Sequence, residues 1–137
     1  MYFLTPFTKL GMAAEGASSF SFPAIMGHLK AAAILLVGDG ISADDAERLG
    51  LVSKILPTHE FLGNVLDIAT RLASSLHGAL QATKALMRNR SRQELLDAND
   101  RECALIQNER FGSEENLKAV SQFRRDQELR KKHRVRL

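Results

Sequence analysis

Glu15 is the one charged residue in the stretch from Leu10 to Ser19, which otherwise holds only glycine, alanine, serine, leucine and methionine. If the turn around it is covered, the carboxylate is poorly solvated, and burial disfavours its charged form. A carboxylate in that environment suits a general base working near neutral pH. The alternative is an exposed carboxylate at a helix N-terminus, where the helix dipole favours negative charge. The residue pattern alone favours this alternative.

The other side chains that could do chemistry are scattered. Cys103 is the single cysteine, which excludes an internal disulfide and fits a reducing compartment. Its place in a helical pattern predicts a buried structural thiol rather than a nucleophile. The segment Gly38-Asp39-Gly40 lacks the further glycine and the preceding strand of a phosphate-binding loop, so it predicts a simple turn. No metal site is predicted, because metal-ligand spacing is absent among the four histidines, His28, His59, His77 and His133.

Composition places the chain among globular proteins of one domain. It has 137 residues, of which 45% are hydrophobic, and this suffices for a core. The net charge of +3 is modest, and much of the positive charge lies between Arg124 and Arg136. No apolar run approaches the ~20 residues that span a bilayer. The first residues lack the basic region of a signal peptide.

The first part of the chain mixes strand, turn and helix signals around Glu15. Tyr2 to Leu4 reads as a strand that stops at Pro6, since proline donates no ladder hydrogen bond. Gly11 and Gly16 bracket the turn that carries Glu15. After this turn the pattern predicts a helix capped by Ser18 or Ser19 and ended by Gly27, an alanine-rich buried helix over 28–36, a helix over 43–49 capped by Ser42, and a strand over 51–56 stopped by Pro57.

From residue 58 onward the pattern is helical. Phe61, Val65, Ile68 and Leu72 recur at helical spacing, which predicts an amphipathic helix. Altogether we expect helices over 60–75, 79–88, 91–110 and 114–131. The third carries Leu95, Ala98, Leu105 and Ile106 on one side, and the last buries Leu117, Val120 and Phe123.

Two segments resemble a known family. Residues 5–27, TPFTKLGMAAEGASSFSFPAIMG, are similar to the enoyl-CoA isomerase branch of the crotonase superfamily, in particular to the peroxisomal delta-3,delta-2-enoyl-CoA isomerases. Residues 36–57, LVGDGISADDAERLGLVSKILP, resemble the superfamily more generally. The resemblance runs over nearly the whole chain and weakens after Gly78. It implies an α/β fold (α+β by content), in which residues 1–57 form the C-terminal part of the crotonase ββα spiral and residues 58–137 a C-terminal helical region.

The resemblance implies that Glu15 shifts a double bond of a 3-enoyl-CoA to the trans-2 position during fatty acid β-oxidation. One carboxylate can take the proton from C2 and return it to C4, while two backbone N–H groups hold the enolate oxygen. Hydratases use two glutamates, one of them after a proline at a strand end, where this chain has Phe7 after Pro6. The CoA thioester is the substrate and no cofactor is implied. The acyl end of the pocket would be lined by Leu10, Gly11, Met12 and Ala14.

The resemblance covers only the C-terminal half of the family pattern, and the oxyanion-hole loop lies in the other half. We therefore expect the 137 residues alone to lack isomerase activity, because removal of one oxyanion donor costs about 10²–10³ in rate. A non-catalytic or truncated crotonase-like module that binds an acyl-CoA or a protein partner is the alternative, and a basic-tailed nucleic-acid binder ranks last.

The family further implies a homo-oligomer, trimer or hexamer, without a membrane span. The C-terminal Val135-Arg136-Leu137 is similar to peroxisomal targeting signals that end in a basic residue and leucine. Peroxisomal import is thus expected, with cytoplasmic or mitochondrial placement as the alternatives.

Overall fold

The computed structural model describes residues 2–134, and within 130–134 only the backbone. Its sheet is small: β1 (Tyr2–Phe3) pairs antiparallel with β2 (Ile41–Ser42), and Tyr2 faces Ser42 while Phe3 faces Ile41. The strand expected at the start of the chain is therefore confirmed, and it ends before Pro6. Its partner follows directly on the predicted turn at 38–40. Most of the described chain is helical, as the α+β content predicted.

The strand expected over 51–56 is wrong. A β-ladder would need the N–H groups of Leu51 and Val52. Both instead donate to the carbonyl of Ala46, at 2.9 and 3.3 Å. The N–H of Ile55 bonds to Oε1 of Glu47 at 3.1 Å. The segment thus closes the end of the preceding helix, and the described sheet offers it no partner.

Three short helices form the body of the molecule. The first two are α1 (Ser18–Met26) and α2 (His28–Ala32). The second continues as a π-helical turn over Ala33–Val37 (η2). Burial of the 28–36 segment on most faces was expected, but Leu29 and Leu36 are exposed, because α2 contacts neighbours on one side only. The third helix is α3 (Ala43–Arg48), which Ser42 caps as predicted. The buried apolar residues are Ala17, Ala31, Ile34, Leu35, Ala46 and Ala98.

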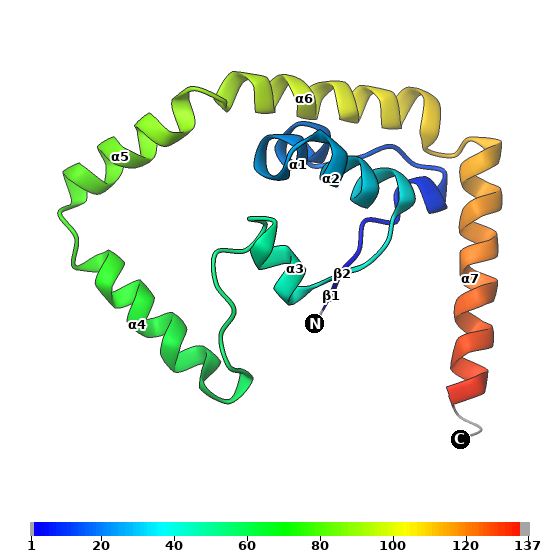
Figure 1. Ribbon diagram of the computed structural model, residues 1–137. Helices are drawn as coiled ribbons and strands as arrows, with labels where there is room; N and C mark the ends of the chain where they lie inside the picture. The colour runs from blue at the N-terminus through cyan, green and yellow to red at the C-terminus, as the bar shows by residue number, and fades with distance from the viewer. Residues whose placement is uncertain (1, 135–137) are drawn as a thin grey trace.

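The helices of the second half form an open arch around this body (Figure 1). Helix α6 lies along α1, and the first turn of α7 lies beside a 3₁₀ turn at Thr8–Leu10 (η1). The boundary at residue 57 stays a prediction. The helices predicted from 60 onward are confirmed with ends shifted by up to a few residues. Their bounds are η3 (Thr58–Glu60), α4 (Phe61–Ala73), α5 (His77–Asn89), α6 (Arg92–Leu105) with the π-helical turn η4 (Ile106–Arg110), and α7 (Glu114–Arg134).

Burial along the last two helices differs from the expectation. Leu117 is 59% exposed and Phe123 is also exposed, whereas Asn116, in the first turn of α7, is buried against Leu10 and Gly11. The thiol of Cys103 is exposed, whereas its neighbour Glu102 takes the inward position on α6. The predicted burial of Leu117, Phe123 and Cys103 is therefore wrong, whereas Val120 is half-buried.

Two further sequence predictions concern a membrane span and a targeting signal. Among the described helices none is long and apolar enough to cross a membrane. The tripeptide Val135-Arg136-Leu137 lies outside the described residues.

Candidate active site

Glu15 lies at the tip of a tight turn that leads into α1. Gly16 and Ala17 both adopt left-handed backbone conformations, with φ of 66° and 57°. The carbonyl of Glu15 accepts a hydrogen bond from the N–H of Ser18 at 3.2 Å, which closes the turn. The Glu15 side chain is exposed, so the expectation of a poorly solvated carboxylate is not met in this structure.

The predicted serine cap of α1 is wrong. The residue at the N-cap is Ala17, which has no side-chain oxygen, and Ser18 is buried with a hydroxyl that has no hydrogen-bond partner among the described residues. The cap comes from α6 instead. Oε2 of Glu102 accepts from the N–H of Ala17 at 2.6 Å, and Oε1 accepts from the N–H of Ser19 at 2.8 Å. A carboxylate in this position accepts hydrogen bonds from free N–H groups at the helix start, and its negative charge is stabilised by the helix dipole.

The segment that leads into this turn is held at its start by the junction of α6 and α7. Nδ2 of Asn116 donates to the carbonyl of Leu10 at 2.7 Å. Nε and Nη2 of Arg110 donate to the carbonyl of Gly11 at 3.1 and 2.9 Å. Gly11 is buried against Asn116 with a positive φ of 65°, so this glycine is required both by its conformation and by the close approach.

The predicted acyl-lining residues lie in the segment that leads from the 3₁₀ turn to Glu15. Gly11 is buried, and Leu10, Met12 and Ala14 are half-buried. Their role in binding stays a prediction, as does that of Glu15 as base.

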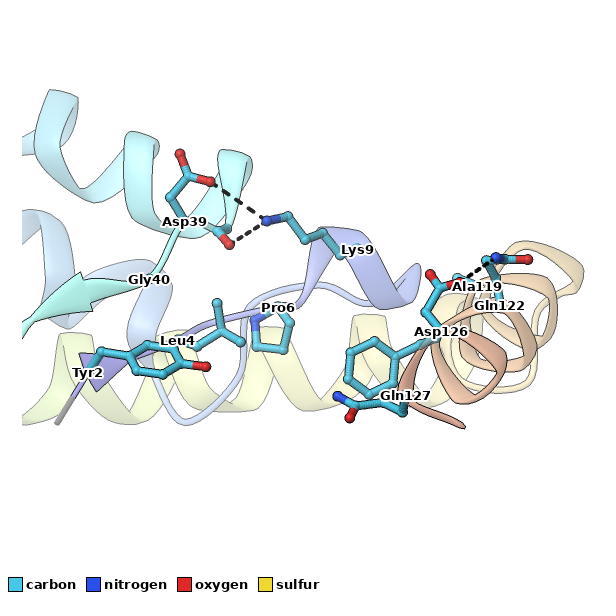
Figure 2. Close-up of a pocket in the computed structure, with 12 residues that line it drawn as sticks. Tyr2, Leu4, Pro6, Lys9, Asp39, Gly40, Ala119, Gln122, Asp126 and Gln127 are labelled. Carbon is cyan, nitrogen blue, oxygen red and sulfur yellow. Dashed lines mark hydrogen bonds and ion pairs between the residues drawn. The ribbon is translucent and has the colours of Figure 1, made fainter. Parts of the chain in front are cut away.

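A cavity of about 460 Å³ lies beside the turn, between β1, Lys9 and α7 (Figure 2). Nζ of Lys9 donates to the carbonyl of Gly38 at 2.6 Å and lies 3.8 Å from Oδ1 of Asp39. Tyr2, Leu4 and Pro6 supply an apolar wall. Neither Glu15 nor the predicted acyl-lining residues line this cavity. Among the described residues no cluster of three or more histidine, cysteine or acidic side chains could hold a metal.

The family model described as enoyl-CoA hydratase/isomerase matches residues 1–131. The chain belongs to the enoyl-CoA hydratase/isomerase family. It is 36% identical to human enoyl-CoA delta isomerase 2 over 121 residues, which are 88% of this chain and 30% of that protein. It is 35% identical to mouse enoyl-CoA delta isomerase 3, peroxisomal, over 88% of this chain and 38% of that protein.

Chromodomain proteins are similar to this chain as well. The human testis-specific chromodomain protein Y 1 is 37% identical over 105 residues, which are 77% of this chain and 19% of that protein. The chain thus spans well under half the length of each of these relatives.

The fold agrees with this family. The crystal structure of an enoyl-CoA hydratase/isomerase from Pseudoalteromonas atlantica T6c superposes with a TM-score of 0.86 at 28% identity, covering 91% of this chain and 50% of that one. The resemblance to the crotonase superfamily and the partial crotonase-like α/β fold are thereby confirmed.

Sequence reasoning missed the three residues that hold the turn, Glu102, Arg110 and Asn116. One signal could have found Glu102, since it follows Ala98 by four residues and precedes Ile106 by four, on the side of the helix expected to face the core. A carboxylate on such a face requires hydrogen-bond donors from another element. Nothing in the pattern identifies those donors as N–H groups 83 and 85 residues away.

Proposed function

We propose that this family member acts as an enoyl-CoA delta-isomerase together with the half of the fold that carries the oxyanion hole, and that Glu15 moves the proton from C2 to C4 of a 3-enoyl-CoA. The observation that carries the proposal is the Glu15 turn. Its backbone is fixed at both ends by α6 and α7, while the carboxylate itself is free to face a substrate. Similarity to two proteins named enoyl-CoA delta isomerases supports the same reaction.

The exposed position of Glu15 fits a base that becomes covered when substrate binds. An acyl chain laid over the turn would exclude water from the carboxylate, and a dry site strengthens its interaction with the developing charge. Small side chains at Ala13 and Ala14 leave room for such an approach. Because no other described carboxylate lies in this turn, one group would perform both proton transfers.

The test is substitution of Glu15 by glutamine in the full-length protein, with a 3-enoyl-CoA as substrate. The conjugated 2-enoyl product is followed by its ultraviolet absorbance. General acid–base catalysis contributes about 10²–10⁴ in rate, so we expect kcat to fall by that factor. Glu94→Gln, at an exposed position of α6, makes the same charge change and should leave kcat unchanged. Activity of Glu15→Gln within twofold of the wild type would refute the assignment.

A second candidate function is binding of an acyl-CoA or a protein partner without turnover. It is favoured by the similarity to a protein named for its chromodomain rather than for an isomerase reaction. Calorimetric titration with an acyl-CoA, together with the assay above, separates the two. Binding without conversion of any 3-enoyl-CoA supports this second candidate.

Peroxisomal location and a trimeric or hexameric assembly belong to the same proposal. Similarity to a relative named as peroxisomal supports the first. Fusion of the last dozen residues to a fluorescent protein tests import, and a diffuse cytosolic signal would contradict it. Sedimentation of the full-length protein measures the oligomeric state.

A further inference from the structure

Glu102 is a buried carboxylate, 6% exposed, whose two oxygens both face the start of α1. It belongs to α6, which lies along α1 in Figure 1. Its partners are the N–H groups of Ala17 and Ser19, so both oxygens are used by the backbone. Hydrogen bonds from N–H groups to a carboxylate are stronger than those between neutral groups. This contact is therefore a firm attachment between two distant parts of the chain.

The attachment holds a backbone conformation that Ala17 does not favour by itself. With φ of 57°, Ala17 is the one non-glycine residue of positive φ in the described chain. A left-handed alanine persists only where its surroundings hold it. Here the surroundings are the Glu102 carboxylate on one side and the bond from Ser18 to the Glu15 carbonyl on the other. Glu15 is two residues from Ala17, so the direction of its side chain depends on this conformation.

We propose that Glu102 is a positioning residue for Glu15. Through Ala17 and Ser19 it fixes the turn so that the Glu15 carboxylate stays oriented toward the substrate. Glu102 itself, buried beneath the turn, touches no reacting atom. This inference rests on the proposed isomerase function, and it adds a residue from the C-terminal helices to the machinery of the N-terminal turn.

The experiment compares Glu102→Gln with the matched control Glu94→Gln in the full-length protein. Glutamine keeps the shape of the side chain but replaces one acceptor oxygen by an NH₂ group, which cannot accept a bond from an N–H. Misplacement of a reacting group by about 1 Å costs up to about 10²-fold. We expect kcat of Glu102→Gln to fall about 10- to 100-fold with KM within twofold, while Glu94→Gln matches the wild type.

A double variant separates positioning from general damage to the fold. If Glu102 acts only through Glu15, then Glu15→Gln with Glu102→Gln has the same kcat as Glu15→Gln alone, because coupled residues are not additive. A merely structural role predicts a further loss in the double variant. That result, or a kcat of Glu102→Gln within twofold of the wild type, would overturn the proposal.

Amide hydrogen exchange gives a readout that needs no activity. Exchange over residues 15–19 should rise on the order of tenfold in Glu102→Gln, since a lost charged hydrogen bond frees these amides, while exchange over 43–48 stays constant. Unchanged exchange over 15–19 overturns the inference. If Glu15→Gln stays active, the proposed base fails separately, and exchange alone decides whether Glu102 fixes the turn. Glu102→Asp, which keeps the charge on a shorter side chain, replaces Glu102→Gln if the latter does not fold, with the same expectations.

Discussion

Arg110 and Gly11 are joined by two hydrogen bonds across 99 residues of sequence. Nε and Nη2 of the guanidinium both donate to the Gly11 carbonyl, and Nη2 also contacts Oε2 of Glu115 at 2.6 Å. The guanidinium presents its donors in a rigid fork, which suits this double contact. Arg110 thereby ties the end of η4 and the start of α7 to the residue where the Glu15 turn begins.

Replacement of Arg110 by lysine should destabilise the protein, because an ammonium group is a point donor without the fork. Hydrogen bonds that involve a charged group contribute about 1.5–3 kcal/mol. Loss of one of the two bonds to the Gly11 carbonyl should therefore lower the free energy of unfolding by about 2 kcal/mol. Urea denaturation measures it. Arg92→Lys, at an exposed position on α6, is the control and should change stability by less than about 0.5 kcal/mol. Equal stability of the two variants would contradict the role of the fork.

Gly11→Ala should destabilise the fold more than Gly16→Ala. Both glycines have a φ near 65°, where a side chain costs roughly 1–2 kcal/mol. A Cβ at position 11 would in addition lie 2.9 Å from Cα of Asn116, whereas at position 16 it meets no atom within 4 Å. Overpacking adds about 1–3 kcal/mol.

Thermal or urea unfolding measures the stability of both variants. Because the backbone strain is similar at the two positions, the difference between the variants reports the contact with Asn116. Equal losses of unfolding free energy at positions 11 and 16 would show that α7 can move away from a Cβ at position 11 without destabilising the fold. That result would contradict the prediction.

Ser42→Ala should lower stability by about 1 kcal/mol through loss of the N-cap of α3. The Ser42 hydroxyl accepts from the N–H of Asp45 at 3.0 Å. Ser53→Ala, at an exposed position outside any helix, is the control and should have a negligible effect. Unfolding free energies of the two variants test this, and a neutral Ser42→Ala would argue that the helix is held by its tertiary contacts alone.

Asp45 should contribute stability that depends on pH. The hydrogen bond from the Ser42 hydroxyl, aided by Arg48, holds the pKa of Asp45 below its ordinary value of 3.8. Because the folded-state pKa is the lower one, the contribution is complete above pH 3.8 and is lost as pH falls through the folded value.

The melting temperatures of the wild type and of Asp45→Asn, measured across this range, should therefore differ most above pH 3.8 and converge below it. Carboxyl titration by NMR should also place the pKa of Asp45 closer to 3.8 in Ser42→Ala. A gap between wild type and Asp45→Asn that is independent of pH would contradict the prediction.

The local elements were predictable from sequence because their signals are local. Ser42 followed by two aspartates defines the start of α3, and Gly11 and Gly16, predicted to bracket the turn that carries Glu15, both have a positive φ. The strand over 51–56 failed since its apolar pattern does not reveal that Ala46 and Glu47 take its N–H groups.

The partners of the candidate site were not predictable in the same way. Whether Cys103 or Glu102 faces inward depends on which helix lies against α6, and a carboxylate there is stable only because Ala17 and Ser19 present free N–H groups. Glu15 was found from its small neighbours and from the family resemblance. Its exposure depends on what the turn lies against, which is information that its own segment does not contain.

The attachment of Glu102 to Ala17 also bears on the order in which the protein can mature. A ribosome synthesises Ala17 long before Glu102, which lies 85 positions later in the sequence, and the two residues meet only after Glu102 has been made. Contacts between such distant segments form late and slow the search for the native state. The nascent chain therefore carries the Glu15 turn in an unfixed form until α6 and the start of α7 have left the exit tunnel, so the candidate catalytic geometry is among the last features to form.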